Sequence, residues 1–223
     1  MTDTNKITAA VQRLSAILPL QANLASLDAG SRKIYHAIQQ SYLTQGRAPT
    51  LAELESISAQ ARESVQNLSV KDMIVSNAQG EITGAYPFTS EARQSRVELN
   101  GHTVYAMCAL DALAPAAMAQ CNSRVISECA ITQQAVIVEL DNQKILNADA
   151  ACDIFVGINW QAACSKTSCA ASLCTEMIFL KGEDTARQWQ TDDPSNRELF
   201  ILPEALQFSA DFFVPLIKKH PKQ

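Results

Sequence analysis

The spacing of apolar residues changes near residue 90, and this change divides the chain into two parts with different secondary structure. Before it, apolar residues recur with a helical period, as is typical of amphipathic helices. After it, short segments alternate between apolar and polar residues, as is typical of strands. All seven cysteines also lie in the second part. We therefore predict two domains, residues 1–90 and 91–223, with different roles.

Helices followed by a β-hairpin are predicted in residues 1–90. The helices are expected at residues 7–18, from Ser31 to about Leu43, as a short segment after Thr50, and at about residues 61–68. Thr50 and Glu53 fit a capping box, because each side chain can accept a hydrogen bond from a free amide of the first turn. Residues 73–88, MIVSNAQGEITGAYPF, alternate around a polar turn and predict the hairpin. This order of elements indicates a winged-helix-like N-terminal domain.

The charge of this N-terminal domain argues against DNA binding. Residues 1–90 hold seven basic and seven acidic side chains, and the whole chain has a net charge of −5. The helix that would enter a DNA groove carries Arg62 directly before Glu63. A nucleic-acid-binding domain usually presents a basic face. We expect no nucleic-acid partner and favour a structural or lid role for this part.

Residues 91–223 predict an α+β domain with a mixed β-sheet and flanking helices. The strand candidates are RQSRVEL, HTVYAM, SRVISECAIT, QAVIVEL, DIFVGIN and TEMIFLKG. Turn pairs such as Asn100-Gly101 and Asp141-Asn142 separate some of them. Helices are expected at about residues 108–120 and 183–190, and after Pro203.

The state of the cysteines depends on where the protein resides. The first twenty residues include an early acidic residue and frequent polar ones, unlike a secretory signal. No segment approaches the roughly eighteen apolar residues of a membrane span. We therefore expect a cytoplasmic protein without membrane association. Seven cysteines in that compartment remain thiols, which serve as buried apolar residues, metal ligands or nucleophiles.

Cys108 and Asp111 lie where a predicted strand passes into a predicted helix. Three positions apart, they project from nearly the same helix face. A cysteine at a helix N-terminus meets free amides and the positive end of the helix dipole, so we expect a lowered thiol pKa. A carboxylate beside a thiolate, in a site poor in water, can hold and release one proton. The alternative is that Cys108 is only a buried apolar residue and Asp111 only caps the helix.

A second group of cysteines, Cys164, Cys169 and Cys174, recurs at intervals of five residues. This spacing is longer than that of the usual zinc-binding pair, and the histidines are distant in sequence, at positions 36, 102 and 220. A soft ion such as mercury or copper(I) is bound well by two or three thiolates. The group therefore favours a soft-metal site over a zinc site.

Three segments together resemble the bacterial alkylmercury lyases: GHTVYAMCALD at 101–111, VISECA at 125–130 and LCTEMIF at 173–179, with Trp189 beyond them. The family motif is a Cys-Ala-Leu-Asp segment and a distant cysteine just before a strand that ends in aromatic residues. Cys108, Asp111 and Cys174 occupy those three places, and Cys129 matches a buried structural cysteine. The resemblance spans most of the chain, since the family also has a winged-helix-like part before its catalytic domain.

The resemblance implies an enzyme that needs no cofactor and splits an organomercurial into a hydrocarbon and mercuric ion by protonolysis. Cys108 and Cys174 would bind the mercury as thiolates, and Asp111 would deliver the proton and complete the mercury site. Free thiols would be required for turnover. Mercuric ion would then pass to mercuric reductase or to a low-molecular-weight thiol.

The chain departs from the family pattern in two places. Met107 stands where a tryptophan is expected, and the segment before Cys174 is longer and brings the additional Cys164 and Cys169. The alternative function is a soft-metal binding or sensing protein without turnover. Such a sensor needs a basic DNA-binding face, and neither a sensor nor a metal carrier gives Asp111 a role.

Overall fold

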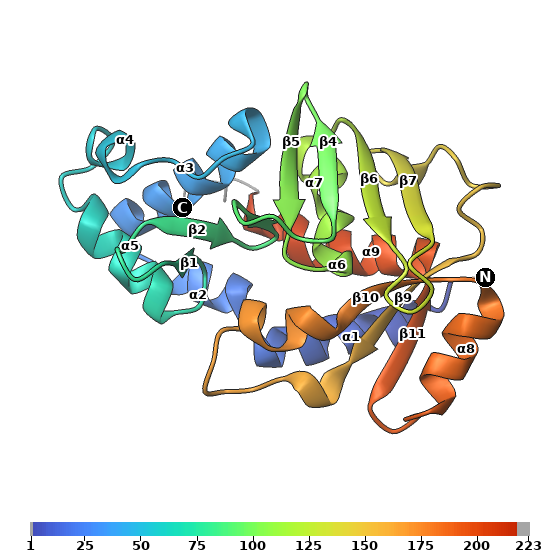
Figure 1. Cartoon of the computed structure of the whole chain (residues 1–223). Coiled ribbons are helices and arrows are strands. Elements are labelled where there is room, and N and C mark those ends of the chain that lie inside the picture. Colours follow the sequence, from blue (N-terminus) through green and yellow to red (C-terminus); the bar gives the residue numbers. More distant parts are fainter. Residues whose placement is uncertain (1, 218–223) are drawn as a thin grey trace.

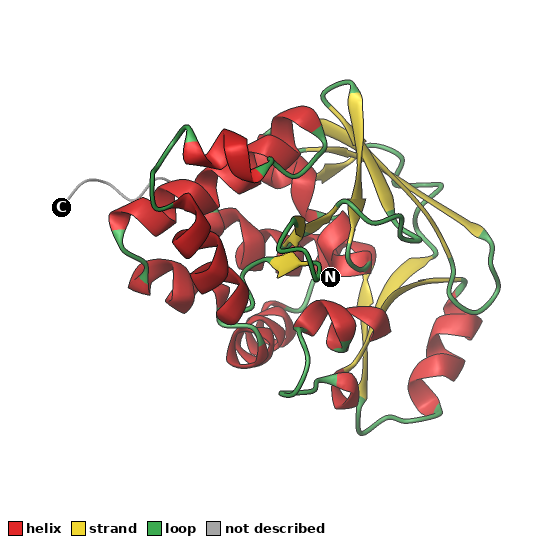
Figure 2. Ribbon diagram, turned by 60° about the vertical axis from the view of Figure 1, so that its left-hand side comes forward, coloured by secondary structure: helices red, strands yellow, loops and turns green. Residues whose placement is uncertain are grey.

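The computed structural model describes residues 2–217, in which two antiparallel sheets are packed among helices (Figure 1). Most of the helices gather on one side of the sheets (Figure 2). This arrangement confirms the predicted mixture of helices and strands. No helix within residues 2–217 has both the length and the apolar character that a membrane crossing requires.

The N-terminal part contains five helices in residues 2–70. They are α1 (Thr4–Ile17), α2 (Leu20–Ser26), α3 (Ala29–Gln45), α4 (Leu51–Glu55) and α5 (Ala61–Val70). Four of them confirm the predicted helices, and the short α2 was not predicted. The capping box at α4 is present: the Glu53 N–H donates to Thr50 Oγ1 at 3.2 Å, and the Thr50 N–H donates to Glu53 Oε2 at 2.7 Å. One face of α3 is completely buried, at Ile34, Tyr35 and Ile38.

The predicted hairpin forms the edge of an eight-stranded sheet. The strands of this sheet are β1 (Val75–Ser76), β2 (Ile82–Ala85), β3 (Phe88–Thr89), β4 (Arg96–Leu99), β5 (His102–Ala106), β6 (Asn122–Glu128), β7 (Ala135–Asp141) and β8 (Lys144–Ile145). The order across the sheet is β1-β2-β3-β5-β4-β6-β7-β8. The sheet therefore continues without a break from the hairpin into the strands that follow residue 90.

A second sheet of three strands, in the order β10-β9-β11, lies below the first in Figure 1. It consists of β9 (Ile154–Asn159), β10 (Met177–Lys181) and β11 (Arg197–Ile201). β11 was not predicted, because its charged first half, Arg197-Glu198, hides the strand pattern.

The prediction of one mixed sheet is wrong, since every strand pair in both sheets is antiparallel. A strand, helix and strand in succession suggest parallel neighbours. Here the helical segment after β5 does bring the chain back, so that the next strand runs in the same direction as β5. The next strand, β6, nevertheless pairs with β4, which lies between β5 and β6 and runs the opposite way.

The helix predicted at 108–120 is divided into α6 (Ala109–Ala112) and α7 (Ala114–Ala119). Pro115 has no N–H to continue the hydrogen bonds of α6. The other two helices are confirmed as α8 (Glu183–Thr191) and α9 (Leu202–Phe213). Most of α9 is buried, and the Ser209 hydroxyl donates to the Leu110 carbonyl at 2.9 Å, which fixes α6 against α9.

A partly buried ion pair joins α1 to α9. Lys6 Nζ lies 2.7 Å from Glu204 Oε2, and the Glu204 side chain is only 6% exposed. The same ammonium donates to the Leu199 carbonyl at 2.6 Å and lies 4.6 Å from the centre of the Phe200 ring. Segments almost two hundred residues apart are held together by this contact.

We expect Lys6→Met to lower the free energy of unfolding by about 2 kcal/mol, because it leaves the buried Glu204 carboxylate without a cation and with only the Asp3 and Ile201 N–H groups as donors. Arg62→Met is the matched control, since the Arg62–Glu55 pair is exposed and 3.4 Å long. It should change stability by less than about 0.5 kcal/mol. Urea unfolding measures both variants, and equal losses would contradict the assigned role of Lys6.

Candidate active site

The three residues singled out from the sequence meet in the interior. The sulfur atoms of Cys108 and Cys174 and a carboxylate oxygen of Asp111 all lie within 4.8 Å of one another. Each of the three residues is at most 6% exposed. Two thiols and one carboxyl group at this separation can surround a single soft cation.

The turn between β5 and α6 positions Cys108 and Asp111. Cys108 is the N-cap residue of α6, and its Sγ atom accepts a hydrogen bond from the Asp111 N–H at 3.3 Å. The Cys108 carbonyl accepts the Ala112 N–H at 3.0 Å. The expected placement of both side chains on one helical turn is therefore present, and the bond from Ser209 to Leu110 holds that turn in place.

Cys174 reaches the site from a short 3-10 turn, Leu173–Glu176, that leads directly into β10. The first residue of β10, Met177, pairs with Ile158 of β9. The Cys108 thiol donates to the Met177 Sδ atom at 3.6 Å. The pairing of β10 with β9 thus fixes the position of Met177, and the Cys174 turn therefore ends beside Cys108.

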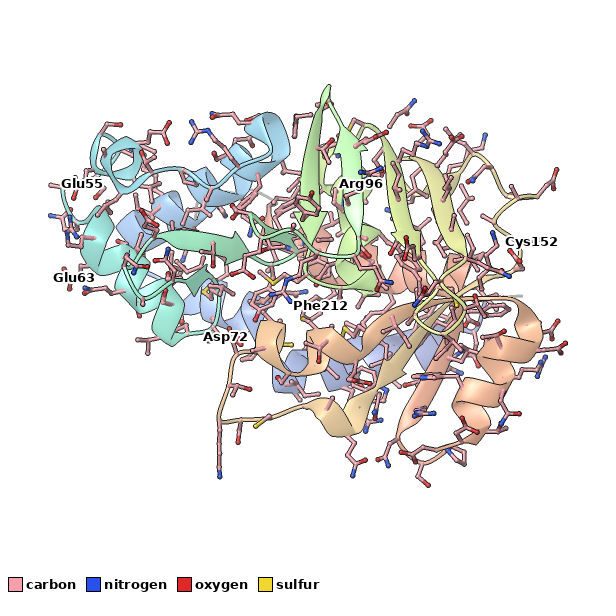
Figure 3. The ribbon with its side chains drawn as sticks, viewed as in Figure 1. Glu55, Glu63, Asp72, Arg96, Cys152 and Phe212 are labelled. Carbon is pink, nitrogen blue, oxygen red and sulfur yellow. The ribbon has the colours of Figure 1, made fainter. Side chains whose placement is uncertain are left out.

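The N-terminal part holds the loop that carries Cys174 (Figure 3 labels Asp72, next to this loop). The Cys169 N–H donates to Asp72 Oδ2 at 2.8 Å, and the Ala170 N–H donates to the Tyr86 hydroxyl oxygen at 2.9 Å. The Tyr86 hydroxyl in turn donates to Asp72 Oδ1 at 2.9 Å. Asp72 and Tyr86 therefore tie the loop to the turn after α5 and to the turn before β3. The sequence carried no signal for these contacts.

The structure separates the remaining cysteines into those near the site and those away from it. Cys169 is buried, with its Sγ 3.7 Å from that of Cys174, so it joins the site. Cys129 lies in a separate buried cluster with Trp189, and its Sγ accepts the Thr132 and Lys181 N–H groups. Cys121, Cys152 and Cys164 are half-buried or exposed.

Burial changes the acidity of all three central groups. It raises the pKa of the Cys108 thiol to about 12, so the predicted lowering by a helix N-terminus is wrong. The helix α6 is only four residues long, and its few amides do not offset the loss of water around the sulfur. The adjacent Cys108 thiol, then Cys169 and burial, raise the pKa of Cys174.

Burial also raises the pKa of Asp111, to about 7, and the neighbouring Cys108 and Cys174 thiols oppose the shift only in part. Its Oδ2 atom has no nitrogen or oxygen donor among the described residues. Near neutral pH this carboxyl group is therefore divided between its protonated and ionised forms. A group in that condition can accept and return a proton.

A cavity of about 270 Å³ opens onto the two central cysteines. Its wall includes Met107, at the place where the family resemblance predicts a tryptophan, and Phe179 of β10. Arg93 and Gln94, from the loop before β4, complete its rim. A small organic group would fit a partly apolar cavity of this size.

Comparison with known proteins identifies the family of the chain. A sequence model of the family "MerB: Alkylmercury lyase" matches residues 88–214 of the 223 residues. The fold is similar to the crystal structure of the mercury-bound form of MerB2, with a TM-score of 0.73 and 22% identity over 91% of this chain and 98% of that chain. No curated protein matches. Because the family match covers more than half of the chain, the protein belongs to the alkylmercury lyase family, whose members cleave the carbon–mercury bond.

Proposed function

We propose that Cys108, Asp111 and Cys174 are the residues with which this organomercurial lyase acts. The observation that supports this assignment is their convergence: two sulfur atoms and one carboxylate oxygen, from two distant segments, lie within 4.8 Å in a buried site. Soft sulfur ligands suit the mercury atom of the substrate. The carboxyl group suits delivery of a proton to its carbon atom.

The first step is transfer of the organomercury cation from a small thiol to one cysteine of the site. The proton of that cysteine leaves with the released small thiol. The second cysteine then gives its proton to the ionised Asp111 carboxylate and binds the mercury as a thiolate. Because burial raises the pKa of Asp111 to about 7, the carboxyl group can hold this proton near neutral pH.

The second step breaks the carbon–mercury bond. Two thiolates on mercury increase the electron density on the bonded carbon, and Asp111 donates its proton to that carbon. The products are a neutral hydrocarbon, mercuric ion on two thiolates and an ionised Asp111. Burial of all three groups keeps competing water away from the developing charge.

The proposed chemistry uses side chains alone, with mercury as substrate and product and no organic cofactor. Mercuric ion bound by two thiolates leaves by exchange with another thiol. We propose mercuric reductase or a low-molecular-weight thiol as the acceptor, in a cytoplasmic setting that keeps the cysteines reduced.

For residues 1–90 we propose a winged-helix-like domain that supports the catalytic domain of residues 91–223 and binds no nucleic acid. Asp72 and Tyr86 provide the support, through their hydrogen bonds to the loop before Cys174. Glu55 and Glu63 lie at the outer edge of the helices (Figure 3), where a DNA-binding face would need basic residues.

Release of benzene from phenylmercury by the purified protein, with excess thiol, tests the assignment. Multiple turnovers are expected for the unaltered protein. Cys108→Ala and Cys174→Ala should abolish them, because each removes a mercury ligand. Asp111→Ala should slow them at least about 100-fold, because it removes the proton donor. Cys152→Ala, which alters an exposed cysteine away from the site, is the control and should keep full activity.

Stoichiometric mercury binding without benzene would contradict the catalytic assignment. The protein would then be a soft-metal binding protein without turnover. Full activity in Asp111→Ala would show instead that the proton comes from another group.

The raised pKa of Asp111 also predicts how stability depends on pH in the mercury-free protein. The folded state binds this proton more tightly than the unfolded state, where the pKa is near 3.8. The resulting stability is fully present below pH 3.8 and is lost as the pH rises through about 7. Asp111→Asn has no such loss. Its stability relative to the unaltered protein should therefore increase by a few kcal/mol between about pH 4 and pH 8.

Asp28→Asn should show the opposite trend. Its stability relative to the unaltered protein should decrease as the pH rises, because hydrogen bonds from Ser31 lower the pKa of the Asp28 carboxyl group. Urea unfolding at a series of pH values measures both variants. A stability difference for Asp111→Asn that stays constant with pH would show that Asp111 is not held with a raised pKa.

A further inference from the structure

A third thiol lies beside the two that are proposed to bind mercury. The Sγ atom of Cys169 is 3.7 Å from that of Cys174, within hydrogen-bonding distance for sulfur, and Cys169 is only 4% exposed. On the other side of the site, Cys108 contacts the sulfur of Met177 at 3.6 Å. The interior therefore holds four sulfur atoms in close succession, with Cys174 between Cys108 and Cys169.

The backbone around Cys169 is hydrogen-bonded to the N-terminal part of the chain. Its N–H donates to the Asp72 carboxylate at 2.8 Å, and the next N–H, of Ala170, donates to the Tyr86 hydroxyl. Both acceptors come from the N-terminal part, and Tyr86 itself donates to Asp72. Together they hold the short turn Cys169–Ala171 against the Cys174 turn.

Cys129 shows what a structural cysteine looks like in the same protein. Its sulfur accepts two backbone N–H groups, from Thr132 and Lys181, and so completes the hydrogen bonding of a turn and a strand. The sulfur of Cys169 has a different partner, the thiol of Cys174. Two adjacent buried thiols make a chelating pair for a soft cation.

We propose that Cys169 and Cys174 form a second dithiol site, which takes over the mercuric ion after the carbon–mercury bond has been broken. The proposal rests on the function proposed above, in which Cys174 is already a mercury ligand. Transfer would move the toxic ion away from Cys108 and Asp111 while it stays bound, and exchange with a small thiol would then free Cys174 for the next substrate.

The transfer is a ligand exchange without oxidation or reduction. The sulfur of Cys169 bonds to mercury, the bond from mercury to Cys108 breaks, and Cys174 remains bound throughout. The proton of the Cys169 thiol ends on the Cys108 thiolate. The mercuric ion has two thiolate ligands before and after the step, and the total charge is unchanged.

Mercury retention by proteins that lack Cys108 tests the second site directly. Cys108→Ser, Cys108→Ser/Cys169→Ser and Cys108→Ser/Cys164→Ser are each loaded with mercuric chloride in excess monothiol and then gel-filtered. Bound mercury per chain and thiolate-to-mercury absorbance are measured. Monothiol removes ions that are held by one cysteine only. The variant with Cys164→Ser is the matched control, because Cys164 lies in the same loop but is exposed.

Cys108→Ser and the Cys164 control should each retain one mercuric ion. The Cys169 double variant should bind it at least about 100-fold more weakly, because it has lost the chelating partner of Cys174. Equal retention by all three proteins, or no retention by Cys108→Ser, would overturn the second site. The benzene assay judges the proposed function separately, so either conclusion can fail without the other.

Turnover with Cys169→Ser gives a second readout that a purely structural role would not produce. Its steady-state rate at limiting thiol should fall about tenfold, because the product leaves Cys108 more slowly. An excess of a small dithiol, which removes mercuric ion from the site, should restore the rate. A rate that dithiol does not restore would mean that Cys169 acts on folding or chemistry and not on product transfer.

Discussion

Burial of two thiols and one carboxyl group within a few ångströms of one another is the constraint on which the rest of this structure depends. In water these groups would titrate separately, but in the interior burial raises the pKa of Cys108 and of Asp111. The two thiols of the resting site therefore carry protons, and the Asp111 carboxyl group is divided between its protonated and ionised forms near neutral pH. In the proposed mechanism, mercury displaces the thiol protons, and the carboxyl group returns one of them to carbon. The burial that raises these pKa values thus suits the proposed protonolysis.

The fold brings these groups together from segments that are far apart in sequence. The turn from β5 to α6 supplies Cys108 and Asp111, and α9 supports it through Ser209. The turn before β10 supplies Cys174. Its loop is tied to the N-terminal part by Asp72 and Tyr86, so that part helps to position Cys174. The large sheet contains strands from both sides of residue 90 and so joins the two parts of the chain.

Local features of the site could be predicted from the sequence, but properties set by tertiary contacts could not. The spacing of Cys108 and Asp111 places them on one turn, and the family resemblance supplied Cys174. Helices with a clear period, such as α1 and α3, were predicted for the same local reason. The position of Cys169 depends on hydrogen bonds across the fold, and the thiol pKa depends on burial, so the predicted lowering at Cys108 was wrong. The prediction of a mixed sheet was also wrong, because the order of connections does not determine which strands pair.

The most direct test is a crystal structure of the Asp111→Asn protein after exposure to phenylmercury. Asparagine keeps the shape of the site but has no acidic proton to deliver to carbon. The proposed mechanism predicts mercury bonded to the sulfur atom of Cys108 or Cys174 with the phenyl group still attached, in the cavity beside Met107. Mercury at these sulfurs without its phenyl group would show that another residue delivers the proton. Mercury bound only at exposed cysteines would contradict the site itself.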